Sequence, residues 1–185
     1  ASVAFAADAM WLRLLGSLLT GLTLVRVFIV YHDYQHQAML KDSRLAWGIL
    51  SLYGYIMLTP PSVWKRSHDH HHRHNSKLFG ASIGSFPIMT TDNYKAASPG
   101  QQLEYRVARS PMIIVFGYLT VFMFGMCVRP LLMDARRHWD AVLSLAIHFG
   151  IIASLVLWCG WPTAILTAIL PTWVASAAGA YLFYI

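Results

Sequence analysis

Four long apolar segments constrain this chain more than any other feature of its sequence. They cover roughly residues 10–31, 111–128, 141–159 and 162–185. Each is close to the ~18–20 residues that an α-helix needs to cross a bilayer. We therefore predict an all-α, helical integral membrane domain.

The composition agrees with that prediction. Hydrophobic residues make up 57% of the chain and charged residues only 12%, whereas soluble domains carry about 25% charged residues. A length of 185 residues suffices for one domain, so we treat 1–185 as a single unit. The net charge of +6 requires no nucleic acid, since membrane proteins collect Lys and Arg on cytoplasmic loops. Cys127 and Cys159 lie in apolar runs, which indicates neither a disulfide framework nor a metal cage.

One of the four long segments and a fifth, shorter apolar stretch are not expected to cross the bilayer. The stretch 45–58 is shorter than a span and ends at Pro60-Pro61, which favours an interfacial or re-entrant piece. The loop 129–140 carries three arginines, which favours the cytoplasmic side. That position requires 111–128 to dip into the membrane without crossing it. The last two segments would then form a hairpin that returns the chain to its starting side.

Two histidine-rich boxes carry the chemistry. The first is His32-Asp33-Tyr34-Gln35-His36, and the second runs from His68 to His74 after Trp64-Lys65-Arg66-Ser67. With about 100° per residue, His32 and His36 fall about 40° apart on a helix. His68, His71 and His72 share an arc of about 100°, with His70 and His74 on the opposite face. The spacing predicts five converging imidazoles, which suit Zn, Cu, Fe or Ni.

Other interpretations of the boxes remain open. A lone pair of histidines four residues apart is usually surface decoration, and a His-rich tract can be a loose Zn or Ni binder. A different class is a His-rich membrane metal-binding or transport protein, which would carry its ligands inside the spans. Here only His148 lies within one. The stretch 32–110 has more basic than acidic residues, which places both boxes on the cytoplasmic side.

The boxes and their flanks resemble those of the membrane fatty acid desaturases. The shared patterns are Phe28-Ile29-Val30-Tyr31-His32-Asp33-x-x-His36 and Trp64-Lys65-Arg66-Ser67-His68-x-x-His71-His72. The stretch Leu103-Glu104-Tyr105-Arg106-x-x-Arg109-Ser110-Pro111 is similar to bacterial members of the acyl-lipid type. The boxes are specific for the wider superfamily of desaturases, hydroxylases and ketolases. A fatty acyl or carotenoid hydroxylase or ketolase is therefore the alternative activity.

The resemblance implies a centre of two non-haem Fe ions on the cytoplasmic face. Its ligands here would include His32, His36, His68, His71 and His72. Such a centre uses O2 and two electrons to remove two hydrogens from a fatty acyl chain in the lipid bilayer. The family also implies an electron donor such as ferredoxin or cytochrome b5. The basic face of this chain is compatible with an acidic donor.

Three polar residues in the boxes have a possible supporting role. Asp33 and Asp69 are expected either to orient a ligating histidine of the neighbouring box or to be solvated charges. His74, like His70, is either a donor behind the ligands or exposed.

Two histidines lie outside the boxes. His148 is either an extra ligand, as in some related enzymes, or a neutral, hydrogen-bonded histidine in an apolar segment. His138 has arginines and a tryptophan beside it, which predicts an interfacial residue.

One feature of the family is missing. Nothing in the chain matches a third histidine box, and the aromatic run before Ile185 is similar to the one that precedes that box. We therefore expect a truncated chain that neither holds a complete di-iron site nor turns over. An apolar acyl tunnel lined by Trp47, Tyr53, Tyr55 and Met57 is a further expectation, with core packing as the alternative.

Overall fold

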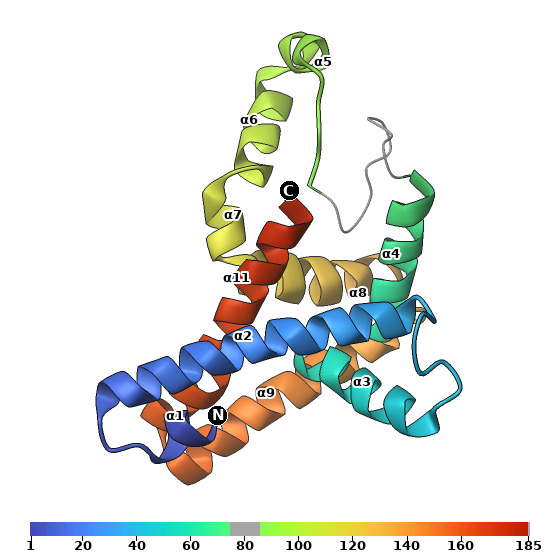
Figure 1. Cartoon of the computed structure of the whole chain (residues 1–185). Coiled ribbons are helices and arrows are strands. Elements are labelled where there is room, and N and C mark those ends of the chain that lie inside the picture. The colour runs from blue at the N-terminus through green and yellow to red at the C-terminus, as the bar shows by residue number, and fades with distance from the viewer. Residues whose placement is uncertain (75–85, 185) are drawn as a thin grey trace.

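The computed structural model describes residues 1–74 and 86–184, with side chains described for 1–70 and 86–184. Within these ranges every regular element is a helix, which confirms the all-α prediction (Figure 1). In chain order these are α1 Ser2–Ala6, α2 Met10–Gln35, α3 Arg44–Ile56, α4 Pro61–His74, α5 Thr91–Ala96, α6 Pro99–Ala108, α7 Pro111–Val115, η1 Tyr118–Val128, α8 Arg129–Asp134, α9 Trp139–Cys159, α10 Trp161–Ala164, η2 Ile165–Ile169 and α11 Leu170–Tyr184, where η1 and η2 are π-helical.

Three helices in the described part of the chain are long and apolar enough to cross a membrane. They are α2, α9 and the continuous helix Trp161–Tyr184 formed by α10, η2 and α11. They coincide with three of the four apolar segments. Large apolar side chains point outward, as in α9, where Leu157 and Trp158 are 80% and 87% exposed. Exposed apolar surfaces of this kind are stable in contact with lipid, so the helical membrane domain is confirmed.

The remaining long apolar segment, 111–128, is broken into α7 and η1. The break falls at Gly117, which packs directly on α11: an added Cβ would lie 2.9 Å from the Ser176 carbonyl oxygen. Neither piece is among the helices long enough to cross. That the segment enters the membrane without crossing it stays a prediction.

Helices α2 and α11 form the frame on which the site is built. They cross in close contact near the middle of α2, where Gly21 faces the backbone of α11. A Cβ at Gly21 would lie 2.9 Å from the Pro171 carbonyl oxygen and 2.8 Å from the Val174 Cβ. Small residues allow this approach, which is the usual packing device between membrane helices.

Helix α3 is short and ends inside the protein. Ser43 caps its first turn by accepting the Ala46 N–H at 3.2 Å. Its last turn leads into Met57, Leu58 and Thr59, which are 5%, 0% and 0% exposed. Carbonyl groups buried away from water need partners. Side chains of other helices donate hydrogen bonds to these carbonyl oxygens. Ser144 donates to the carbonyl of Tyr55 at 2.8 Å and His148 to that of Ile56 at 2.7 Å. Cys127 donates to the carbonyl of Leu58 at 3.6 Å and Tyr31 to that of Thr59 at 3.0 Å.

This fixed end of α3 sets where α4 begins. Pro60 is followed by Pro61 at the first position of α4, where a missing N–H costs nothing. The first turn of α4 then places Trp64, 2% exposed, in an aromatic cluster. Its ring centroid lies 5.1 Å from that of Phe28 in α2 and 5.7 Å from that of Phe183 in α11. Three helices distant in sequence therefore meet at the base of α4.

Candidate metal centre

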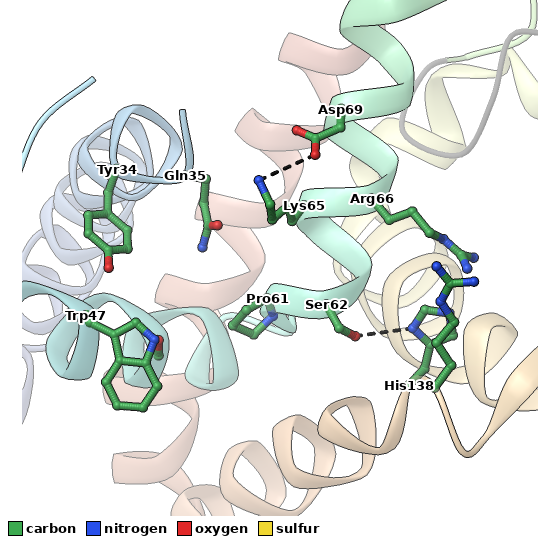
Figure 2. A pocket seen from close by; sticks show the side chains of 11 residues that line it. Tyr34, Gln35, Trp47, Pro61, Ser62, Lys65, Arg66, Asp69 and His138 are labelled. Atoms are coloured by element: carbon green, nitrogen blue, oxygen red, sulfur yellow. Dashed lines mark hydrogen bonds and ion pairs between the residues drawn. The ribbon is translucent and has the colours of Figure 1, made fainter. Parts of the chain in front are cut away.

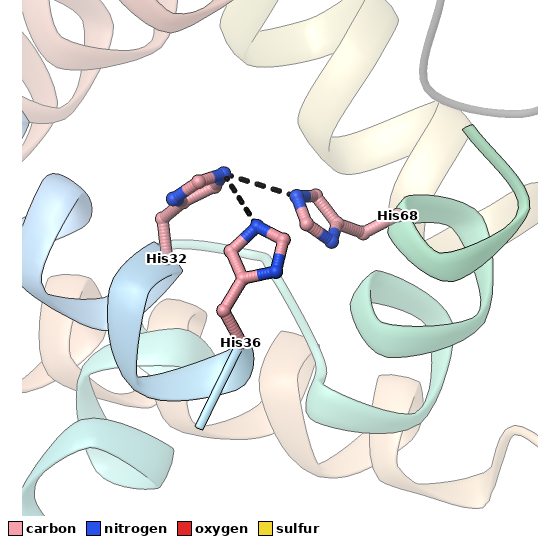
Figure 3. Close-up of side chains that lie close together, drawn as sticks. All are labelled: His32, His36 and His68. Atoms are coloured by element: carbon pink, nitrogen blue, oxygen red, sulfur yellow. Dashed lines mark hydrogen bonds between the residues drawn. The ribbon is translucent and has the colours of Figure 1, made fainter. Parts of the chain in front are cut away.

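The last turn of α2 supplies two histidines of the candidate centre. The apolar segment predicted to end near residue 31 continues as helix to Gln35, with His36 as the capping residue. His32 and His36 therefore lie one turn apart on the same face, as the spacing predicts. Their Nε2 atoms are 3.3 Å apart (Figure 3).

Helix α4 brings a third histidine to the same point. His68 is 8% exposed, and its Nε2 lies 3.0 Å from the Nε2 of His32. Trp64, one turn earlier, stacks on the His68 ring at a centroid distance of 5.4 Å and fixes its plane. One nitrogen from each of His32, His36 and His68 lies within 4.8 Å of the other two (Figure 3).

This donor set fits a transition metal. Nitrogens that bind one ion at about 2.0–2.1 Å lie about 3 Å apart when their bonds are near right angles. The distances of 3.0 and 3.3 Å between the ring nitrogens match that spacing. Imidazole nitrogens also suit iron, copper or zinc and not the hard cations. The three side chains are thus prearranged for a metal of this kind.

Asp33 decides which nitrogen of His32 faces the cluster. Its Oδ1 lies 3.0 Å from His32 Nδ1. An ionised carboxylate only accepts hydrogen bonds, so the proton of neutral His32 lies on Nδ1. The Nε2 lone pair then points toward His36 and His68. The sequence left open whether Asp33 orients a histidine of the other box or is a solvated charge, and here it contacts the adjacent histidine of its own box.

The other residues predicted from the second box are less fully placed. Asp69 lies 3.4 Å from Lys65, one turn earlier on α4, in a partly exposed ion pair. The backbone of α4 is helical through His74. The side chains of His71, His72 and His74 lie outside the described residues, so their roles stay predictions. On a continuous helix, positions 71 and 72 share the face of His68.

His148 lies away from the three-histidine cluster. Its Nδ1 donates to the Ile56 carbonyl at 2.7 Å, and its Nε2 lies 2.6 Å from the Tyr118 hydroxyl. The proton on Nδ1 makes Nε2 the acceptor of the tyrosine O–H. Both nitrogens are therefore engaged in holding α3, η1 and α9 together. This is a hydrogen-bonded arrangement, which was one of the two alternatives that the sequence left open.

A second polar cluster, formed by Ser62, His138 and Asp140, has no counterpart in the sequence predictions. The Ser62 hydroxyl donates to Asp140 Oδ1, and the Ser62 N–H donates to Asp140 Oδ2 at 2.9 Å. His138 Nδ1 lies 3.2 Å from the Ser62 hydroxyl. His138 is 1% exposed beneath α4, so its side chain is buried in protein, and its position at the membrane interface stays a prediction. The available signal was Asp140, a costly charge at the start of a span that calls for a partner.

Two of the four residues expected to line an acyl tunnel, Tyr53 and Met57, line an apolar crevice, and the other two do not. Tyr53 and Met57 are buried in the core, and the Tyr53 hydroxyl donates to the Leu24 carbonyl at 2.7 Å. Trp47 is 63% exposed, and Tyr55 is partly buried. The narrow apolar crevice runs between α2, α3, η1 and α11, past Phe28, Tyr53, Met57, Phe122 and Gly179.

Fold and site together define a helical membrane protein with a histidine cluster at the end of one span. The chain belongs to the fatty acid desaturase family, whose profile, described as "Fatty acid desaturase", matches residues 9–185. The family is membrane-bound, and its members are oxidoreductases of lipid metabolism.

Two curated relatives agree with that family. A "Fatty acid desaturase" of Bacillus subtilis is 30% identical over 166 residues, which are 88% of this chain and 46% of the relative. An "sn-1 oleoyl-lipid 12-desaturase" of Synechocystis sp. is 29% identical over 96 residues, which are 50% of this chain and 26% of that relative. The match thus spans about half the length of the first relative and about a quarter of the length of the second. No solved structure matches it.

Proposed function

We propose that this chain is the metal-binding part of an O2-dependent fatty acyl desaturase that acts on membrane lipids. Membership of the fatty acid desaturase family supports the reaction class. The name of the Synechocystis relative, an oleoyl-lipid desaturase, supports an acyl group carried on a lipid. The single observation that carries the proposal is the convergence of His32, His36 and His68 from two helices.

We propose that His32, His36, His68, His71 and His72 belong to a centre of two non-haem irons, completed by ligands outside the described part of this chain. Iron, unlike zinc, changes oxidation state and would supply the oxidant that an unactivated C–H bond requires. In the net reaction the acyl chain loses two hydrogens, and O2 with two electrons and two protons becomes two waters.

The chain's own residues contribute orientation and exclusion of water. Asp33 keeps the proton of His32 on Nδ1, away from the cluster. Trp64 and Phe183 close the apolar side of the cluster, with ring centroids 5.7 Å apart. Beneath them the apolar crevice has a volume of about 10 Å³, close to the smallest that holds one water. An acyl chain must widen it to enter, and it would lie there without water.

The orientation and the electron donor are also proposals. Arginines and lysines near the ends of α2, α4 and α9 favour a cytoplasmic position for the cluster. The same charges would attract an acidic donor such as ferredoxin or cytochrome b5, with a rate that falls as salt rises.

The proposal is tested on the full-length protein by iron analysis and by mass spectrometry of lipid acyl chains. We expect bound iron and acyl chains lighter by two hydrogens. His32→Ala and His68→Ala should each remove both, whereas His70→Ala, in the same box but on the opposite face, should retain both. Acyl chains that gain oxygen would identify a hydroxylase instead, and zinc alone at the site would contradict redox chemistry.

A further inference from the structure

A pocket lies behind the histidine cluster, on the other side of α4. It has a volume of about 520 Å³ and is lined by the last turn of α2, the middle of α3, the first turns of α4 and the turn before α9 (Figure 2). On α4 the pocket is lined by Lys65, Arg66 and Asp69, whereas His68 points to the histidine cluster. On α2 the pocket is lined by Tyr34 and Gln35, whereas His32 and His36 lie on the other face of the helix. The pocket is therefore separate from the metal centre.

The charges around this pocket favour an anion. Three of its lining side chains, Lys65, Arg66 and Arg137, are cationic. Asp69, the one carboxylate in the lining, pairs with Lys65 at 3.4 Å, so the excess positive charge lies on Arg66 and Arg137. Asp140 lies behind the wall, where both of its oxygens are bound by Ser62. His138 also lines the pocket, and its Nε2 is buried without a hydrogen-bond partner among the described residues. Gln35 and Ser51 add neutral polar groups to the wall.

The position of the pocket selects the kind of anion. Tyr34 and Gln35 close the span α2, and His138 immediately precedes the span α9, so two spans leave the membrane at this level. Trp47, 63% exposed on the pocket's rim, is a residue type that anchors at the depth of lipid headgroups. Basic pockets between membrane helices at this depth suit anionic headgroups.

We propose that this pocket binds the phosphate-bearing headgroup of an anionic membrane phospholipid. The site goes beyond the proposed desaturase activity and does not depend on it. A concave pocket of about 520 Å³ is of the size that small ligands occupy. A stable protein partner would instead need about 800 Å² of its own surface at the interface.

The test is lipid binding by the full-length protein in nanodiscs, measured by native mass spectrometry with phosphatidylglycerol or phosphatidylcholine. The wild type should bind phosphatidylglycerol selectively. The double variant Arg66→Gln, Arg137→Gln should bind it about 30-fold more weakly, at about fivefold per cation. Arg136→Gln is the matched control, since Arg136 is exposed in the same turn but does not line the pocket. It should retain wild-type binding.

Three outcomes would overturn the proposal. They are equal binding of the two lipids, equal loss in the Arg136→Gln control, and displacement of the lipid by millimolar inorganic phosphate, which would identify a soluble anion. If the double variant does not fold, Arg66→Gln alone should weaken binding about fivefold. Iron content is measured in parallel. Lipid selectivity without iron would leave this site intact while the desaturase proposal fails.

Discussion

The contact between Asp33 and His32 links Asp33 to the proposed metal centre through one of its expected ligands. Removal of a carboxylate that orients a ligating histidine costs about 10–100-fold in metal affinity. We predict that loss for Asp33→Ala, measured by cobalt or iron titration of the purified protein. Asp42→Ala, which changes an exposed aspartate in the loop after α2, is the control. Unchanged affinity in Asp33→Ala would show that His32 is held by its helix alone.

His138 predicts how stability depends on pH. Burial, reinforced by Arg66 and Arg137 and opposed by Asp140 and Asp134, lowers the pKa of His138 below its ordinary value of 6.5. The unfolded chain then binds a proton more readily than the folded one. Its contribution to stability is complete above pH 6.5 and is lost as the pH falls through the lower folded pKa.

Thermal unfolding in detergent between pH 8 and pH 5 measures this effect. We expect His138→Gln to lose less stability than the wild type over that interval. An equal loss in both proteins would mean that His138 does not titrate on unfolding.

At the scale of elements, the contact of α2 with α11 depends on a glycine. Gly21→Ala places a Cβ against backbone and should destabilise the protein by about 1–3 kcal/mol, since α11 cannot yield locally. Gly150→Ala is the matched change inside another span. A Cβ there meets nothing within 4 Å, and we expect a gain of about 0.5–1 kcal/mol from helix propensity. Thermal unfolding of both variants makes the comparison, and similar effects would contradict the packing.

Some features of these elements can be predicted from nearby residues in the sequence, whereas others depend on contacts between residues far apart in the chain. The span of α9 is predicted from sequence because length and apolar composition are local properties. The shared face of His32 and His36 follows from helical period, which is also local, whereas the contact of His68 with His32 joins residues 36 positions apart. The break at Gly117 depends on contact with α11, and the bond of Ser62 to Asp140 joins residues 78 positions apart. The pattern of residues within a single segment cannot predict contacts of this kind with a distant segment.

The whole molecule has two distinct ends. Helix α9 runs from the Ser62–His138–Asp140 cluster to the turn at Gly160, and its 21 residues span about 30 Å, the thickness of the hydrocarbon core. We predict that the exposed Cys159 and residue 136 face opposite sides of the membrane. Membrane-impermeant maleimide should label Cys159 in intact cells.

Residue 136 is tested as Arg136→Cys in a Cys159→Ser background and should be labelled only after permeabilisation. Cys127, which is 0% exposed, should not react in either experiment. If both positions are labelled from the same side, α9 is not a span. If residue 136 is labelled in intact cells and Cys159 only after permeabilisation, the cytoplasmic placement of the cluster is wrong.

The buried carbonyls at the end of α3 also have a consequence for biosynthesis. Ser144 and His148, which bind the Tyr55 and Ile56 carbonyls, follow them by 89 and 92 residues. A ribosome therefore releases α3 and α4 well before the groups that complete the end of α3 exist. Until α9 has been inserted, this turn must keep its carbonyls in water or in the translocation machinery. The second histidine box is thus made early and reaches its final position only once α9 is in place.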